Sequence, residues 1–161
     1  MADRLASLRA ARGLLAELGQ ICGASPVYES DAMGGPTQGR FLNAAVEIAT
    51  ALEPAPLLDR LLSIERQLGR IRRERWGPRT LDLDLLWSGQ LVVRGPELSI
   101  PHPRLAERTF ALRPLLDVRA DAWDPASGEP YVAALARLAE PALRPICGRD
   151  DWRPDVHHAP R

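Results

Sequence analysis

The sequence predicts one α+β domain over residues 1–161, in which helices cover an antiparallel-rich sheet. Three observations support this. Apolar residues recur at helical spacing in some segments, alternate with polar residues in others, and short turns separate the later strand segments as in hairpins. With 161 residues, 45% of them hydrophobic, the chain can bury one ordinary core.

Helices are expected in three segments. Residues 4–18 place leucines three, four and seven positions apart, and a glycine follows them. Residues 54–68 begin with prolines, which suit the first turn of a helix, and end before another glycine. A last helix is expected over residues 131–139.

Strands are expected where apolar and polar residues alternate or where short apolar runs flank turns. The segments are 25–30, 41–50, 80–87, 91–93 and 98–100, with a turn at Ser88–Gly89. Residues 31–40 contain three glycines and a proline and predict a mobile loop. The tail over residues 147–161 is charged and contains prolines, so we expect it to be loosely packed.

The charge composition excludes several classes of site. All 21 basic residues are arginine and are balanced by 21 acidic residues, so no P-loop lysine or Schiff-base lysine is present. The zero net charge argues against a protein that coats nucleic acid. Two distant cysteines and no apolar leader indicate a cytoplasmic protein without a membrane span.

The strongest chemical signal is an arginine-rich segment followed by two aspartates. Residues 60–79 contain seven arginines and two glutamates, and guanidinium groups bind phosphate oxygens in pairs. Asp82 and Asp84 then share one face of the expected strand, about 7 Å apart. Paired carboxylates suit a magnesium ion that bridges to phosphates. The combination favours phosphoryl or nucleotidyl transfer over its alternative, a solvated loop beside an exposed strand face.

Two further segments carry candidate binding residues. His102 lies between prolines, where it is either a phosphate contact or a turn residue. Phe41 and Asn43 share one face of an expected strand, where they can stack on and hydrogen-bond a heterocycle or simply belong to the core. An RNA-binding module is the rival from another class, but aromatic residues make up only 5% of the chain.

These segments together resemble the 6-hydroxymethyl-7,8-dihydropterin pyrophosphokinases of folate biosynthesis. The resemblance covers roughly residues 4–118, and its most specific piece is R-W-G-P-R-T-L-D-L-D. The matching pieces, in the family's order, are V-Y-E-S at 27–30, F-L-N-A-A-V at 41–46, I-E-R-Q-L-G-R at 64–70, R-W-G-P-R-T-L-D-L-D-L-L at 75–86 and I-P-H-P-R-L-A-E-R-T-F at 100–110.

The resemblance implies a ferredoxin-like fold and transfer of pyrophosphate from ATP to the hydroxymethyl group of the pterin, with release of AMP. It implies two magnesium ions on Asp82 and Asp84, and phosphate contacts from the catalytic Arg70 and Arg79. The ATP site would contain Glu65, Arg72, Trp76, Leu85, Ser99, His102 and Arg108. The pterin site would contain Ser30, Met33, Phe41, Asn43 and Phe110. We expect a monomer whose partners are these small molecules, without nucleic acid or membrane.

One departure from the family concerns the start of the chain. Family members begin with an apolar strand and a Gly-Ser-Asn-Leu-Gly-type turn, whereas this sequence begins at Met1-Ala2-Asp3-Arg4. An assigned start that lies too late is the favoured interpretation, because the residues with chemical roles are intact. The alternative is a degenerate or truncated homologue that binds ATP or pterin with little or no turnover.

Overall fold

The computed structural model describes residues 2–31, 40–69, 81–138 and 143–154. Helices flank antiparallel strands, which confirms the predicted α+β class and is consistent with a ferredoxin-like fold. In chain order the elements are α1 (Ala2–Leu15), β1 (Gln20–Ala24), β2 (Val27–Ser30), β3 (Phe41–Asn43), β4 (Val46–Ala49), α2 (Pro54–Gly69), β5 (Val93–Arg94), β6 (Ser99–Ile100), the 3₁₀ helix η1 (Leu105–Glu107), α3 (Thr109–Val118), α4 (Tyr131–Arg137) and β7 (Arg144–Cys147).

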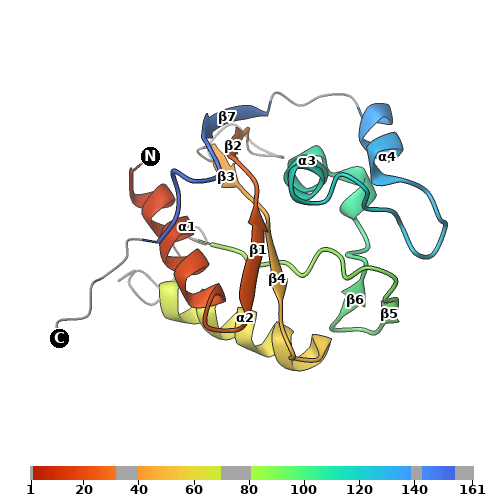
Figure 1. Cartoon of the computed structure of the whole chain (residues 1–161), viewed down its shortest axis with the longest axis horizontal. Helices are drawn as coiled ribbons and strands as arrows, with labels where there is room; N and C mark the ends of the chain where they lie inside the picture. Colours follow the sequence, from red (N-terminus) through yellow and green to blue (C-terminus); the bar gives the residue numbers. More distant parts are fainter. Residues whose placement is uncertain (1, 32–39, 70–80, 139–142, 155–161) are drawn as a thin grey trace.

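The helices lie on two sides of the strands. Figure 1 shows α1 and α2 on one side of the β1–β4 pair and α3 and α4 on the other. One apolar cluster joins Leu15 of α1 to Leu57, Leu61 and Ile64 of α2. A second cluster, around the fully buried Leu112, joins α3 to α4 and η1. Each side of the strands therefore has its own core.

The segment expected as one strand over residues 41–50 is two strands with different partners. β3 pairs with β2 and β4 pairs with β1, all antiparallel. Between the pairs, the backbone N–H of Ser25 donates to the carbonyl of Ala45, and the Ser25 hydroxyl accepts the N–H of Ala45, both at 2.9 Å. The segment from β1 to β2 and the segment from β3 to β4 are therefore hydrogen-bonded to each other at the point where each changes its pairing partner. Neither β1 nor the helix α3 was expected from the sequence.

Residues 81–88 are not a strand, so the prediction for residues 80–87 is wrong within the described residues. A strand needs a ladder partner, and none of the described strands pairs with this segment. Its backbone bonds elsewhere: Leu83 donates to the Glu65 side chain, and the carbonyl of Leu86 accepts the N–H of His102. The expected alternation survives, because Leu81, Leu83 and Leu85 are half-buried and the intervening aspartates are exposed.

The chain after Cys147 differs from the expected loose tail over its first seven residues. β7 pairs with β2, and Trp152 is only 3% exposed. The indole N–H of Trp152 donates to the carbonyl of Ser25 at 2.9 Å, and the Arg12 guanidinium lies 4.8 Å from the Trp152 ring centroid. Burial of this one aromatic side chain holds residues 148–154 against α1 and β2. Residues 155–161 lie outside the described residues.

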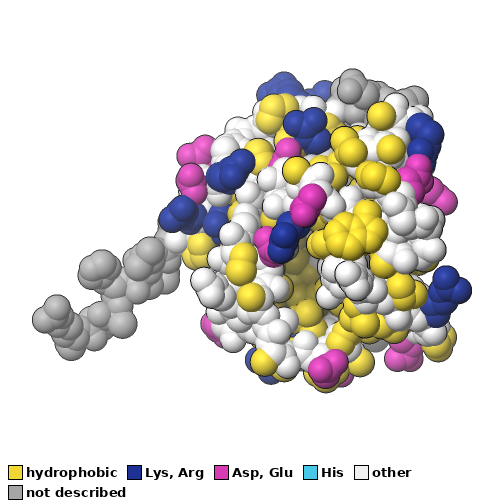
Figure 2. All heavy atoms as spheres, turned by 45° about the vertical axis from the view of Figure 1, so that its right-hand side comes forward, with side chains coloured by type: hydrophobic (Ala, Val, Ile, Leu, Met, Phe, Trp, Pro, Cys, Tyr) yellow, Lys and Arg dark blue, Asp and Glu magenta, His cyan; other side chains and the backbone are white. Residues whose placement is uncertain are grey.

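On the face drawn in Figure 2, hydrophobic side chains line a hollow near the centre of the molecule, beside acidic and basic groups. Among the helices that the structure describes, none is long and apolar enough to cross a bilayer.

The helix expected over residues 4–18 is α1, the second expected helix is α2, and the last is the shorter α4.

Candidate active site

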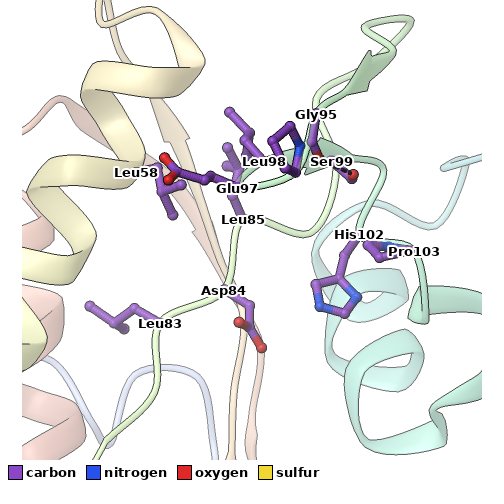
Figure 3. Close-up of a pocket in the computed structure, with 11 residues that line it drawn as sticks. Leu58, Leu83, Asp84, Leu85, Gly95, Glu97, Leu98, Ser99, His102 and Pro103 are labelled. Carbon is purple, nitrogen blue, oxygen red and sulfur yellow. Dashed lines mark hydrogen bonds between the residues drawn. The ribbon is translucent and has the colours of Figure 1, made fainter.

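A pocket of about 250 Å³ lies between α2, residues 83–85, the β5–β6 hairpin and the segment after β6. Four residues that the resemblance assigns to ATP or magnesium line it: Asp84, Leu85, Ser99 and His102. In Figure 3 the Asp84 and His102 side chains extend into the same space, whereas Leu83 points toward α2. The pocket thus brings a carboxylate and an imidazole together beside an apolar wall.

The two aspartates are presented by a segment that is held from both sides. The Glu65 carboxylate, on α2, accepts the backbone N–H of Leu83 at 2.5 Å. Leu83 and Leu85 pack against the apolar cluster of α1 and α2. Further along, the indole N–H of Trp87 donates to the carbonyl of Trp123 at 2.8 Å. Because side chains alternate along extended backbone, these contacts turn Asp82 and Asp84 away from the α2 cluster and toward solvent.

His102 is oriented by its own backbone and by the residue two positions later. Its N–H donates to the carbonyl of Leu86 at 2.8 Å, and its Nδ1 accepts the N–H of Arg104 at 3.2 Å. When Nδ1 accepts a hydrogen bond, the neutral imidazole carries its proton on Nε2. His102 can therefore donate from Nε2 to an anion in the pocket.

Three of the five residues predicted for the pterin, Ser30, Phe41 and Asn43, lie on the β2–β3 pair. Ser30 is opposite Phe41 in the register, and the Asn43 side-chain amide donates to the Ser30 hydroxyl at 2.9 Å. Phe41 is 45% exposed, and a flat ligand can stack on an exposed aromatic ring. This pair offers an aromatic surface and an amide in adjacent positions.

Arg108 and Phe110 lie together at the start of α3. The Arg108 guanidinium is 5.7 Å from the Phe110 ring centroid, within the range of a cation–π contact. The resemblance gives these residues to different substrates, ATP for Arg108 and pterin for Phe110. Their contact joins the two expected binding sites at one helix end.

Five predicted residues lie outside the described residues, namely Met33, Arg70, Arg72, Trp76 and Arg79. Other residues line the pocket but were not predicted from the sequence as site residues. They are Leu58, Leu83, Gly95, Pro96, Glu97, Leu98 and Pro103. The G-P-E-L turn before Ser99 was a usable signal, because a hairpin turn beside a predicted ATP residue must border the same site.

The aspartate pair suits magnesium. Among the described residues, no group of three or more histidine, cysteine, aspartate or glutamate side chains is arranged to hold a metal ion. Magnesium commonly takes only one or two carboxylates and fills its other positions with water and substrate phosphates. Asp82 and Asp84, exposed and on one side of their segment, are such a donor set.

Comparison with known proteins identifies the family. Residues 1–120 match the family model described as 7,8-dihydro-6-hydroxymethylpterin-pyrophosphokinase, HPPK. The chain belongs to the HPPK family.

Relatives within this family match most of the chain. HPPK from Synechocystis sp., named 2-amino-4-hydroxy-6-hydroxymethyldihydropteridine pyrophosphokinase, is 39% identical over 84% of this chain and 71% of its own length. The enzyme of the same name from Bacillus subtilis is 44% identical over 72% of this chain and 71% of its own length. The Aquifex aeolicus enzyme is 36% identical over 90% of this chain and 89% of its own length. The resemblance noted in the sequence is thereby confirmed.

Proposed function

We propose that this HPPK family member transfers the pyrophosphoryl group of ATP to the hydroxymethyl oxygen of 6-hydroxymethyl-7,8-dihydropterin. The observation that carries the proposal is the pocket in which Asp84, Leu85, Ser99 and His102 meet, four residues that the family resemblance assigns to ATP or magnesium. The hydroxymethyl oxygen forms a bond to the β-phosphorus of ATP. The bond between that phosphorus and the α,β-bridging oxygen breaks, AMP leaves, and the hydroxyl proton is lost to solvent.

The nucleotide is oriented by the two ends of the pocket. Leu58 and Leu85 provide an apolar surface for the adenine ring, and the Ser99 hydroxyl lies beside it. Asp84 and His102 lie further along, where an Nε2–H group of His102 suits a phosphate oxygen. We therefore propose that the base occupies the leucine end and the triphosphate runs toward Asp84.

Asp82 and Asp84 would hold magnesium, with two ions along the triphosphate. Magnesium bound there neutralises phosphate charge as the β-phosphorus is attacked. Arg70 and Arg79, in the arginine-rich segment, would grip the phosphates, and Arg72, Trp76 and Arg108 would complete the ATP site. These roles are supported by the family's motif and by the phosphate chemistry of guanidinium groups.

The pterin would lie between Phe41 and Phe110, with Asn43 and the backbone at Ser30 bonding its edge and Met33 above it. The support is the exposed Phe41 ring and the Asn43–Ser30 hydrogen bond beside it. Acceptor and donor need mainly to be held in line, because the metal and arginines absorb the developing charge. We further propose a cytoplasmic monomer that does not bind nucleic acid.

Release of AMP by the purified chain tests this function. The assay contains ATP and magnesium, with and without 6-hydroxymethyl-7,8-dihydropterin. The proposal expects AMP only when pterin and magnesium are both present. ATP and pterin binding without AMP release would instead indicate the non-catalytic homologue, and release of AMP independent of pterin would indicate a hydrolase.

A further inference from the structure

A polar network that is buried at Tyr28 and reaches solvent at Arg113 joins β2 to α3 behind the proposed pterin site. Tyr28 of β2 is 6% exposed, and its hydroxyl donates to Asp117 Oδ2 at 2.6 Å. The other carboxylate oxygen of Asp117 lies 3.3 Å from Nε of Arg113, one turn earlier on α3. Both oxygens of Asp117 are therefore engaged, one to the strand and one along the helix.

This network lies on the same strand face as the pterin residues. Tyr28 is directly opposite Asn43, and Ser30 is directly opposite Phe41. Directly opposed residues share a face of the sheet, as do residues two apart along a strand. Tyr28, Ser30, Phe41 and Asn43 therefore face one side, and the Tyr28–Asp117 bond shows that α3 covers it.

Phe110 lies on the same face of α3 as the network. Phe110, Arg113 and Asp117 are separated by three and four residues, the spacing of one helix face. Because Asp117 bonds to β2, this face is turned toward the strand pair, and α3 also packs against β3. The position of Phe110 relative to Phe41 thus depends on how α3 is fixed against β2.

Electrostatics keep the Tyr28 phenol protonated and the Arg113 guanidinium charged. Burial, and then the hydrogen bond to Asp117, raises the pKa of Tyr28, so its phenol stays neutral and remains a donor. The hydrogen bond that Arg113 donates to the Tyr28 oxygen, and then the charge of Asp117, raise the pKa of Arg113. The Tyr28 hydroxyl is therefore available as the donor at the pH of an enzyme assay.

We propose that Tyr28 and Asp117 are positioning residues for the pterin, which set the separation between Phe110 and the Phe41–Asn43 pair without touching substrate. The inference rests on the proposed function, because it assigns the heterocycle to these aromatic rings. It predicts that loss of the Tyr28–Asp117 bond weakens pterin binding selectively. The proposed ATP site depends less on this bond, because the pocket around Asp84 and Ser99 is held by other contacts, and Arg108 is the assigned ATP residue that lies against Phe110.

The test compares Tyr28→Phe and Asp117→Ala with wild type and with Glu129→Gln, which alters an exposed ion pair next to α4. Pterin affinity is read from the ligand's own fluorescence in the presence of a non-hydrolysable ATP analogue. KM values for both substrates and the thermal midpoint are measured alongside. Tyr28→Phe keeps the buried ring and removes only the hydroxyl, so the protein should remain folded.

We expect each network variant to raise the pterin dissociation constant and KM about fivefold to tenfold, which is part of the free energy of a hydrogen bond to a charged group, because the bond acts on the pterin only through the position of α3. The KM for ATP should change by less than about twofold, and the double variant should be no worse than the worse single variant. Glu129→Gln should match wild type. Asp117→Asn, whose amide oxygen still accepts from Tyr28, should recover most of the affinity.

Three outcomes would overturn the inference. These are unchanged pterin affinity in both variants, equal shifts for pterin and ATP, and additive losses in the double variant. If the wild type turns over pterin and the variants bind pterin as well as the wild type does, only this inference is wrong. Wild type that neither binds nor turns over pterin would defeat the proposed function as well.

Discussion

The Glu65 carboxylate accepts the backbone N–H of Leu83 at 2.5 Å, and Leu83 is the residue between Asp82 and Asp84. No described strand pairs with residues 81–88, so this hydrogen bond to α2 helps to hold their backbone in place. The family resemblance implies that Glu65 contacts ATP. Its bond to Leu83 indicates that it also orients the proposed magnesium ligands.

Glu65 variants test whether Glu65 orients the proposed magnesium ligands. Glu65→Ala should raise the magnesium concentration that gives half-maximal rate by about tenfold, because a charged acceptor to the Leu83 N–H is lost. Glu65→Gln keeps an oxygen acceptor without the charge and should restore most of the magnesium response. A magnesium titration at saturating ATP and pterin measures both. If Gln is as defective as Ala, the negative charge rather than the hydrogen bond is what matters.

Asp82→Ala and Asp84→Ala should each abolish magnesium-dependent turnover, with a loss of at least about 100-fold, because two aligned carboxylates form the proposed metal site. Both side chains are exposed, so the fold should survive, as checked by circular dichroism and the thermal midpoint. Glu53→Ala, which removes an exposed carboxylate from a residue that does not line the pocket, is the matched control. Either aspartate variant retaining full activity would contradict the metal assignment.

Arg79→Ala should lower kcat much more than it weakens ATP binding. Its guanidinium is proposed to contact phosphate oxygens whose charge rises in the transition state, and an interaction that strengthens there affects rate rather than ground-state binding. Steady-state kinetics together with a direct ATP dissociation constant separate the two effects. Weaker ATP binding at an unchanged kcat would show that Arg79 only binds the nucleotide.

Trp152→Ala should destabilise the protein by about 3 kcal/mol or more, the usual cost of removing a buried aromatic side chain. The variant loses the bond to the Ser25 carbonyl and the stacking of Arg12, both of which join residues 148–154 to the core. Val132→Ala, at a position 57% exposed, should change stability by less than about 0.5 kcal/mol. Equal urea midpoints for the two variants would show that the segment contributes little.

The sequence predicted elements whose signals are local. The amphipathic spacing, the opening prolines and the final glycine located α2 correctly at Pro54–Gly69, because each signal acts within the helix itself. The turn at Ser88–Gly89 is confirmed by the hydrogen bond from Leu91 to Ser88 and by a positive φ of 56° at Gly89. The same alternation that suggested a strand over residues 80–87 is present in the burial of its side chains.

Features set by distant contacts could not be predicted in this way. Residues 80–87 have the pattern of a strand, but a strand also needs a partner, and pairing depends on elements far away in sequence. The charges of the tail predicted a loose segment, yet its one indole is buried and bonded to Ser25, while the residues beside it are exposed. β1 was missed because Gly23 and the short Q-I-C-G-A run give no clear alternation. The Tyr28–Asp117 link joins residues 89 positions apart, which composition and spacing do not show.

The transfer of the pyrophosphoryl group itself is tested most directly with labelled ATP. The chain is incubated with magnesium, pterin and ATP carrying phosphorus-32 at either the α or the γ position, and the products are separated. Our account predicts that the γ label appears on the pterin and the α label in AMP. A γ label in free phosphate or pyrophosphate, or an α label in ADP, would contradict it.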